Sequence, residues 1–300
     1  MKNEILLIVN PCSGKGNVSK YVPQICDNLE KQGYELEVIY TSKTNNGEQI
    51  IENYIRYIDA VIVCGGDGTL NEVINGIIKC HKKIDVAFIP FGTTNDFART
   101  VKMPQNHYKL SKKLSTFKEK GVDIGSFNNR FFYYVAAFGV CTNVSYSTEQ
   151  NKKNKYGKLA YYKNGINELK KMKSYQVSIV TDNEIIKDEF IYGAITNSIS
   201  IGSFKWFKRN EFKVNDGKFE LILIKKPKNF LGLIKIFASI LRKKYDQKNI
   251  YYLKTTHLQI DFDKGVDWTL DGEFGGNVNH AIIENHRNKI DLLVPSDKKK

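Results

Sequence analysis

Three glycines, an aspartate and a threonine stand together at Gly65-Gly66-Asp67-Gly68-Thr69, between an apolar run and an amphipathic stretch. Glycine permits backbone angles that a Cβ forbids, so successive N–H groups can converge on one anion. The N-terminus of the helix expected to follow favours the same charge. An aspartate among phosphates would repel them unless a Mg²⁺ ion bridged the two. The stretch therefore predicts a phosphate-binding loop, with a simple helix N-cap at Asp67 as the alternative.

Strands and helices alternate around this loop. Short apolar runs predict buried parallel strands, and apolar residues at helical spacing predict the helices between them. The strands are expected at 4–10, 34–40, 60–64 and 85–90. A doubly wound α/β sheet gathers ligands at the carboxyl ends of its strands. Residues 1–122 therefore predict a nucleotide-binding α/β domain, which a last strand at 289–295 could complete through residues 288–300.

The pattern changes after residue 122. Alternating apolar and polar residues predict an all-β, mostly antiparallel sandwich domain over residues 123–287. Its clearest strands are expected at 176–181, 189–196, 219–224 and 258–263. An apolar stretch at 225–245, bracketed by basic residues, predicts one helix among them.

The charge balance indicates an anionic partner. Lysine and arginine outnumber aspartate and glutamate by 46 to 32, which gives a net charge of +14 and favours nucleic acid, nucleotide or an acidic lipid surface. No pattern of a nucleic-acid-binding fold accompanies the lysines, so nucleic acid is not expected. The five cysteines lack metal or disulfide spacing, no signal peptide is recognisable, and no apolar run approaches the roughly 20 residues of a spanning helix. We therefore expect a cytoplasmic protein.

Six further segments share an order with one known family. They are Asn10-Pro11 with Gly14, Asn71-Glu72, and the segments 90–99, 122–132, 214–224 and 270–273. With the glycine loop they resemble the diacylglycerol kinase catalytic domain superfamily, the bacterial lipid kinases related to sphingosine kinases and, more distantly, to NAD kinases and phosphofructokinases. The glycine loop alone would also fit an NAD kinase, but segments 90–99 and 122–132 are those of lipid kinases. The resemblance implies an NAD kinase-like α/β domain and a β-rich lipid-substrate domain.

The resemblance also implies an ATP site built from loops at the strand ends. The expected nucleotide-binding residues are Asn10, Pro11, Ser13, Gly14, Thr41, Gly65, Gly66, Asp67, Gly68, Thr69, Asn71, Glu72, Thr93, Thr94 and Asn95. Asp96 and Asp123 are expected to support Mg²⁺ and the acceptor hydroxyl, although each also fits a turn or a cap. Family members often have glycine where Thr94 stands, so the loop should be stiffer in this chain.

Phosphoryl transfer to an alcohol also needs a group that accepts the hydroxyl proton. The segment Leu270-Asp271-Gly272-Glu273 supplies two acids, and in the family this loop faces the nucleotide across the interdomain cleft. The sequence leaves open which acid is the base, and we favour Glu273 with Asp271 as its partner. By itself the segment reads as a hairpin turn that carries two exposed acids.

A second magnesium site is implied by the segment 214–220. Bacterial relatives hold a structural Mg²⁺ there through an aspartate side chain and main-chain carbonyls. Carried over, Asp216 is the side-chain ligand, and Lys213 and Lys218 provide the carbonyls. Without the resemblance, the segment indicates only a turn followed by a strand.

The predicted helix at 225–245 suits an anionic bilayer, because one face is apolar and basic residues flank it. The apolar face is expected to consist of Phe230, Leu233, Ile234, Phe237 and Leu241. A second basic group at 152–158 would assist, and the protein would then associate peripherally with membranes. An ordinary helix that packs between domains is the alternative.

These features together predict an ATP-dependent kinase of a membrane lipid alcohol, most simply diacylglycerol to give phosphatidic acid. Another lipid alcohol, such as a sphingoid base or phosphatidylglycerol, stays open because segment 196–216 has aromatic and basic residues where the family is small and glycine-rich. A non-catalytic relative that binds nucleotide or lipid is the alternative from another class. Relatives often form dimers, so a homodimer is expected as well.

Overall fold

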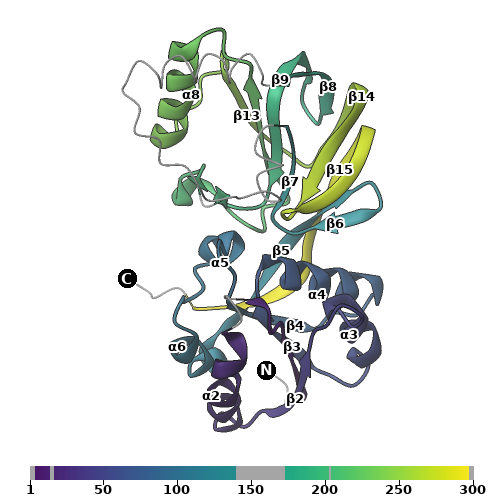
Figure 1. Cartoon of the computed structure of the whole chain (residues 1–300), viewed down its shortest axis with the longest axis vertical. Coiled ribbons are helices and arrows are strands. Elements are labelled where there is room, and N and C mark those ends of the chain that lie inside the picture. Colours follow the sequence, from purple (N-terminus) through teal and green to yellow (C-terminus); the bar gives the residue numbers. More distant parts are fainter. Residues whose placement is uncertain (1–3, 14–16, 140–172, 203, 297–300) are drawn as a thin grey trace.

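The computed structural model describes residues 4–13, 17–139, 173–202 and 204–296, which form an α/β part and a β-rich part (Figure 1). Two sequence predictions, for Gly14 and for the basic group at 152–158, lie outside the described residues. No described helix is long and apolar enough to cross a bilayer.

A parallel sheet organises the α/β part, in the order β4-β3-β1-β2. Its strands are β1 (Glu4–Val9), β2 (Glu35–Tyr40), β3 (Ala60–Gly65) and β4 (Asp85–Pro90). Figure 1 shows α2 and α6 on one side of this sheet and α3 and α4 on the other. Because both faces are covered, an inner strand such as β3 has every residue buried and reads as a continuous apolar run. The predicted α/β region is confirmed, and its strand bounds are within one residue of those expected.

Within the described residues, five helices and one 3₁₀ turn connect these strands and the β-rich part. They are α2 (Val18–Glu30), α3 (Gly47–Tyr54), α4 (Asp67–Lys79), α5 (Asp96–Thr100), α6 (His107–Ser111) and η1 (Leu114–Thr116). Asn46 and Gln49 form a capping box that starts α3 at Gly47, before its first buried apolar residue, Ile50. The helices α5 and α6 are too short to show a period, and the sequence did not predict them.

The β-rich part continues the same hydrogen-bonded sheet, whose longest path is β13-β12-β9-β7-β14-β15-β4-β3-β1-β2. Its strands are β5 (Lys118–Phe127), β6 (Arg130–Phe132), β7 (Val135–Gly139), β8 (Tyr175–Thr181), β9 (Ile185–Thr196), β12 (Phe219–Lys225), β13 (Ile250–Thr255), β14 (His257–Leu270) and β15 (Glu273–Val294). All described pairs among them are antiparallel, as predicted. Hydrogen bonds join them into one sheet, whereas the expected sandwich would have two. A separate hairpin, β10 (Ser200–Ile201) with β11 (Phe204–Lys205), and the turn η3 (Arg209–Glu211) follow β9.

The strand β15 joins the two parts. Its first half pairs with β14, and near its end it pairs antiparallel with β5 and parallel with β4. The register shifts between His286 and Ile290, where Asn288 has a positive φ of 49°. The strand expected at 289–295 is therefore the end of a longer one, so Glu273 at its start is tied to the α/β sheet by its own strand.

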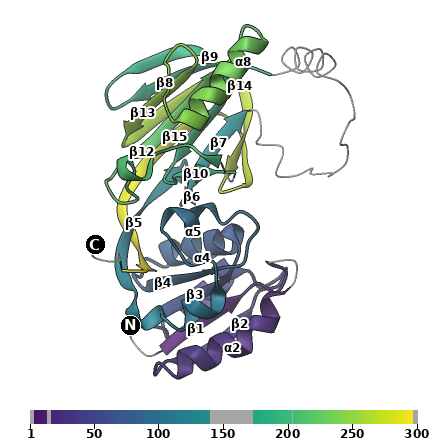
Figure 2. The same ribbon diagram turned by 90° about the vertical axis from the view of Figure 1, so that its left-hand side faces the viewer.

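The last described helix, α8 (Phe230–Arg242), covers the β-rich part from outside (Figure 2). The Asn229 side chain caps it by accepting from the Gly232 N–H at 2.9 Å. Ile236 on its inner face is 4% exposed and belongs to the hydrophobic core. The predicted helix is thus present, with bounds narrower than 225–245.

Candidate active site

The four loops of the expected nucleotide site meet at one edge of the parallel sheet. Asn10 N–H donates to the Cys64 carbonyl at 2.9 Å, and Thr41 N–H donates to the Val9 carbonyl at 2.8 Å. Phe91 N–H donates to the Gly65 carbonyl at 2.7 Å. These bonds join neighbouring strands just past their carboxyl ends, which is where ligands bind in sheets of this type.

The loops after β3 and β4 pack backbone against backbone. A Cβ on Gly92 would lie 2.9 Å from the Gly66 Cα, so a side chain at this position would force the loops apart. Ser13 approaches the same glycine, with its Oγ 3.9 Å from the position of a Cβ on Gly66. The Asn10 amide donates to Thr69 Oγ1 at 2.8 Å and ties the first loop to α4. The N–H groups at the start of α4 are therefore framed by three loops, a site that suits a phosphate.

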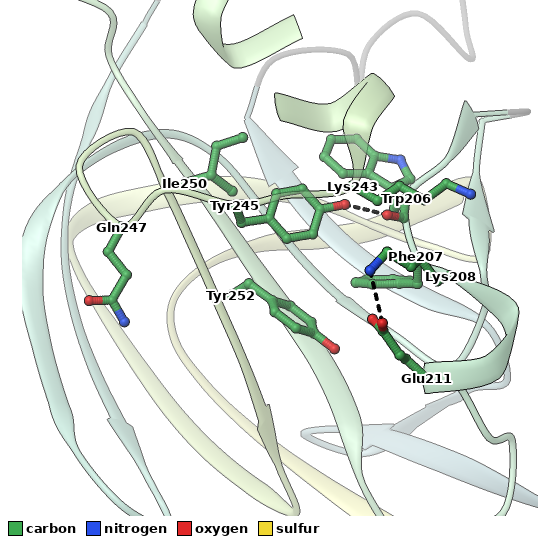
Figure 3. Close-up of a pocket in the computed structure, with 9 residues that line it drawn as sticks. All are labelled: Trp206, Phe207, Lys208, Glu211, Lys243, Tyr245, Gln247, Ile250 and Tyr252. Carbon is green, nitrogen blue, oxygen red and sulfur yellow. Dashed lines mark hydrogen bonds and ion pairs between the residues drawn. The ribbon is translucent and has the colours of Figure 1, made fainter. Parts of the chain in front are cut away.

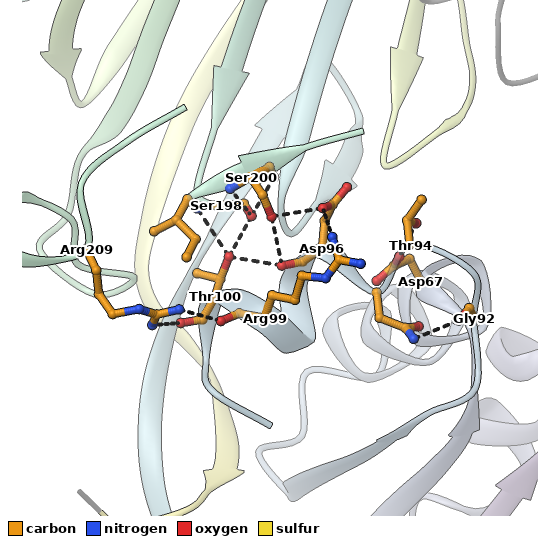
Figure 4. A network of polar contacts seen from close by, with 11 residues as sticks. Asp67, Gly92, Thr94, Asp96, Arg99, Thr100, Ser198, Ser200 and Arg209 are labelled. Atoms are coloured by element: carbon orange, nitrogen blue, oxygen red, sulfur yellow. Dashed lines mark hydrogen bonds and ion pairs between the residues drawn. The ribbon is translucent and has the colours of Figure 1, made fainter. Parts of the chain in front are cut away.

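Asp67 is the first residue of α4 and lies half-buried in this frame. Thr94 Oγ1 donates to its Oδ2 at 3.2 Å, and the two residues lie side by side in Figure 4. The Tyr133 hydroxyl donates to its backbone oxygen at 3.0 Å and lies 3.3 Å from its Oδ1. Burial raises the pKa of Asp67, the charge of Asp96 raises it further, and the Thr94 and Tyr133 hydrogen bonds lower it. The carboxylates of Asp67 and Asp96 and the hydroxyl of Thr94 offer oxygen ligands, which Mg²⁺ prefers. The residues present therefore fit that ion.

Asp96 is buried at the interface between the two parts. The Ser200 hydroxyl, from the β-rich part, donates to its Oδ1 at 2.8 Å. Arg209 donates to the carbonyls of Thr100 and Arg99 at 2.9 and 2.7 Å and so caps the end of α5. Figure 4 shows this network, in which Ser198, Ser200 and Arg209 bind the helix that carries Asp96. The β-rich part thereby fixes one acid of the α/β part.

Asp271 lies in the turn between β14 and β15, with a φ of 52° followed by 92° at Gly272. Positive angles at both residues are the mark of a type I′ hairpin turn. The carboxylate is 4% exposed and accepts four hydrogen bonds: Tyr134 N–H (3.0 Å) and Val135 N–H (2.9 Å) donate to Oδ1, and Tyr133 N–H (2.9 Å) and the Asn71 amide (2.6 Å) donate to Oδ2. Burial raises the pKa of Asp271 to about 7, while these four donors lower it.

This arrangement gives Asp271 a positioning role. A carboxylate has about four lone-pair sites, and each one in Asp271 faces an N–H group, so none is left to take a proton from a substrate. The amide of Asn71 comes from α4, so the bonds also hold the turn against the α/β part. We expect Asp271 to hold the turn so that Glu273, two residues later, keeps its position.

Glu273 follows two residues later and has an exposed side chain. A Cβ on Gly68 would lie 3.1 Å from its Oε1, so the carboxylate lies over the first turn of α4. Its charge also raises the pKa of Glu72, after the larger effect of burial. The structure thus brings an accessible carboxylate of the β-rich part to the loop that carries Asp67.

Some predicted site residues make contacts elsewhere in the protein. Glu72 Oε2 accepts from the Gly47 N–H at 2.9 Å, so it joins α4 to α3. Asn71 is committed to Asp271, whereas Thr93 is exposed at the edge of the site. Asn95 has a left-handed φ of 48°, and its amide donates to the Gly92 carbonyl at 2.7 Å. These residues shape the loops.

Asp123, on β5, lies beside the turn that carries Asp216. Asp123 is fully buried and accepts from the Gly217 N–H at 2.6 Å and the Asn288 N–H at 2.8 Å. Among the described residues, its hydrogen bonds thus join it to the segment after Asp216 and not to Asp67. Asp216 accepts from the Lys218 N–H at 3.2 Å, and Lys254 Nζ lies 3.4 Å from its other oxygen. A cationic side chain therefore already faces the acid expected to bind the second Mg²⁺.

Sequence reasoning missed Tyr133, Ser200 and Arg209. Tyr133 belongs to the run Phe131-Phe132-Tyr133-Tyr134, which is typical of a core strand, and no local signal separates it from its neighbours. The contact of Ser200 with Asp96 spans 104 residues. No spacing rule reaches that far, so only the fold could reveal these residues.

Two cavities and one acidic group lie away from this cluster. A cavity of about 210 Å³ lies beneath the end of α8, and one of about 610 Å³ lies around Glu4 and Glu35, at the amino ends of the strands. Asp85, Glu119 and Asp291 come close together at the start of β4, where Lys83 pairs with Asp291 at 2.7 Å. That group is at the opposite end of β4 from the glycine loops, so it has no part in the site.

Comparisons with known proteins indicate the family of this chain. A family model described as the diacylglycerol kinase catalytic domain matches residues 4–127. The diacylglycerol kinase of Bacillus subtilis (strain 168) is 30% identical over 97% of this chain and 96% of its own length. That of Staphylococcus aureus (strain MRSA252) is 33% identical over 99% and 94%.

Solved structures share the fold. The crystal structure of a diacylglycerol kinase from Bacillus anthracis str. Sterne superposes with a TM-score of 0.77 at 22% identity and covers 97% of each chain. A second structure from that organism gives a TM-score of 0.81 at 27% identity, over 97% of this chain and 95% of that one. The likeness thus extends over both parts of the molecule. With the full-length sequence identity to the B. subtilis and S. aureus proteins, it shows that this chain belongs to the diacylglycerol kinase family.

Proposed function

We propose that this chain transfers the γ-phosphate of ATP to the hydroxyl of a membrane lipid, most simply diacylglycerol, giving phosphatidic acid. The family supports the class of reaction, and the names of the full-length relatives support the acceptor. One observation carries the proposal. Glu273 of the β-rich part lies against Gly68, in the first turn of the helix that follows the glycine loop.

The phosphates would lie against the N–H groups at the start of α4. Asp67 and Thr94, with Asp96 behind them, offer the oxygen donors for Mg²⁺. When bound, Mg²⁺ supplies positive charge that neutralises the phosphate oxygens. The tight contact of Gly66 with Gly92 keeps side chains out of the space beside these N–H groups.

Glu273 is the proposed general base. Its exposed carboxylate would accept the proton of the lipid hydroxyl while the hydroxyl oxygen attacks the γ-phosphorus. The bond from the γ-phosphorus to the β–γ bridging oxygen breaks, and ADP leaves with that electron pair. Asp271 keeps the turn in place, because its four hydrogen bonds join the turn to residues 133–135 and to Asn71 of α4.

A second Mg²⁺ on Asp216, with the carbonyls of Lys213 and Lys218, also stays a proposal. The neighbouring Lys254 would have to move from Asp216 or share it, since Nζ and Oδ2 are 3.4 Å apart. Thermal unfolding of the native chain and of Asp216→Ala, each with and without Mg²⁺, tests this site. Stabilisation of the native chain alone would support it, and equal responses would exclude it.

The proposed reaction is tested by following labelled γ-phosphate from ATP into a panel of lipids. The acceptors would be diacylglycerol, a sphingoid base and phosphatidylglycerol in mixed micelles, with NAD in a parallel aqueous reaction. Labelled phosphatidic acid, lost in Glu273→Gln, is the expected result. Another labelled lipid would move the specificity and keep the mechanism. No labelled product despite ATP binding would overturn the proposal in favour of a binding protein.

A further inference from the structure

The outer face of α8 exposes four large apolar side chains. Leu231, Ile234, Phe237 and Leu241 have exposed fractions of 65, 44, 55 and 76%. Their spacing of three, three and four residues keeps them on one side of a helix. The sequence prediction was right for Ile234, Phe237 and Leu241, whereas Leu233 is half-buried and Leu231 is exposed in its place. The side chain of Phe230, also predicted on this face, lies outside the described ones. We call these four exposed residues the α8 ridge.

The ridge is held outward by contacts on the other side of the helix. Ile236 and Ile240 pack into the core, so the helix cannot rotate without exposing them. After α8, the Tyr245 hydroxyl donates to the carbonyl of Trp206, and the Tyr245 ring lies 5.5 Å from that of Tyr252. Figure 3 shows these aromatic side chains gathered around the end of the helix. The apolar ridge is therefore a fixed feature of the surface.

The segment that carries the ridge holds basic residues and no acidic ones. Residues 221–245 contain seven basic side chains and no acidic one. Lys225 pairs with Asp188 at 2.5 Å, on the strand side. The other six are Lys226, Lys228, Lys235, Arg242, Lys243 and Lys244. Lys235 and Arg242 are exposed and, at 100° per residue, lie along one flank of the ridge.

We propose that the α8 ridge docks on an anionic phospholipid bilayer. The apolar side chains would enter the boundary between headgroups and acyl chains, and the flanking cations would meet the lipid phosphates. The absence of acids across 221–245 favours this partner, because a second copy would bring like charges face to face. The inference rests on the proposed function and deepens it by assigning the surface through which the enzyme reaches its lipid.

Vesicle binding of the full chain tests this without nucleotide or turnover. Co-sedimentation would compare vesicles of phosphatidylcholine with vesicles containing phosphatidylglycerol. We expect binding to the anionic vesicles that weakens with salt, and a loss of about tenfold or more in the double variant Phe237→Gln/Leu241→Gln. Ile185→Gln is the matched control, because Ile185 is 66% exposed on β9 and outside the ridge. It should bind as the native chain does.

A charge variant separates the two components of the surface. Lys235→Glu/Arg242→Glu should also weaken anionic binding about tenfold or more, since two cations near the bilayer become anions. Native-like vesicle binding by both double variants, with circular dichroism confirming their fold, would overturn the inference. So would a dimer in the native chain, measured by sedimentation, that the ridge variant alone abolishes, because the occupant would then be a second copy.

Failure of the docking surface can be told apart from failure of the proposed function. Phosphate transfer to a short-chain, water-soluble diacylglycerol should be unchanged in the ridge variant, because the ridge touches no residue of the site. If transfer is absent in the native chain while anionic vesicles still bind it, the kinase proposal fails and the docking surface stands. If transfer occurs and the vesicle experiments fail, the reverse holds.

Discussion

Replacing Asp271 with asparagine exchanges one carboxylate oxygen for an NH₂ group and should separate positioning from chemistry in the hairpin turn. The oxygen of asparagine can still accept two hydrogen bonds, but the NH₂ group then faces two N–H donors. If it replaces Oδ2, these donors are the Tyr133 N–H and the Asn71 amide. Asn71 can turn its own oxygen toward the new group, which leaves the Tyr133 N–H buried without an acceptor.

The cost follows from counting these groups. A buried donor without an acceptor costs about 1–3 kcal/mol, and the loss of the charge weakens the bonds that remain. Asp271→Asn should therefore destabilise the fold by about 2–4 kcal/mol. Glu273→Gln changes an exposed side chain, so its effect on stability should stay within about 0.5 kcal/mol. Its turnover should fall by about 10²–10⁴, the usual contribution of a general base.

Urea unfolding followed by tryptophan fluorescence measures the first effect, with Trp268 as a fully buried reporter. Labelled phosphate transfer at saturating ATP measures the second. A Glu273→Gln variant that keeps its kcat would remove Glu273 from the mechanism. An Asp271→Asn variant with native stability and no turnover would refute the assignment, because Asp271 would then take part in the chemistry.

Three further outcomes are expected. Tyr133→Phe removes a hydrogen bond that lowers the pKa of Asp67. The acid limb of the kcat/KM profile should therefore move to higher pH, and kcat should fall about tenfold. A pH profile that does not shift would contradict this contact. Gly68→Ala would place a Cβ 3.1 Å from Glu273 Oε1, so turnover should fall. Alanine favours the helix, so the melting temperature should be unchanged or raised. A lower melting temperature would indicate misfolding instead. Burial raises the pKa of Glu220 from 4.5 to about 7, so its stabilising contribution is present at low pH and is lost as pH rises through 7. Between pH 5 and 8, Glu220→Gln should gain about 2 kcal/mol of stability relative to the native chain, and parallel pH profiles would exclude this.

The elements that the sequence predicted are those with a strong local period. The strand at 85–90 has the predicted bounds, and buried apolar side chains repeat along α2 at the expected helical spacing. Such patterns can be read from the sequence because they depend only on which face of a single element is buried. The start of α3 lacks such a period, because a capping box and not an apolar residue begins it. The sequence did not predict that Glu273 and residues 289–295 belong to one strand, because neither segment indicates the strands with which it pairs.

In the candidate site, too, the sequence predicted the local feature and left the long-range contacts open. Gly65 to Thr69, with the family segments around them, were enough to predict a phosphate-binding loop, because glycines at a helix start permit the backbone angles that let N–H groups converge on an anion. The sequence could not rank Asp271 against Glu273, since both are acids in one turn. Tertiary contacts distinguish their surroundings. Donors 136 to 200 residues away occupy every acceptor site of Asp271 and leave Glu273 accessible, because burial and hydrogen bonding depend on which distant segments the fold brings together.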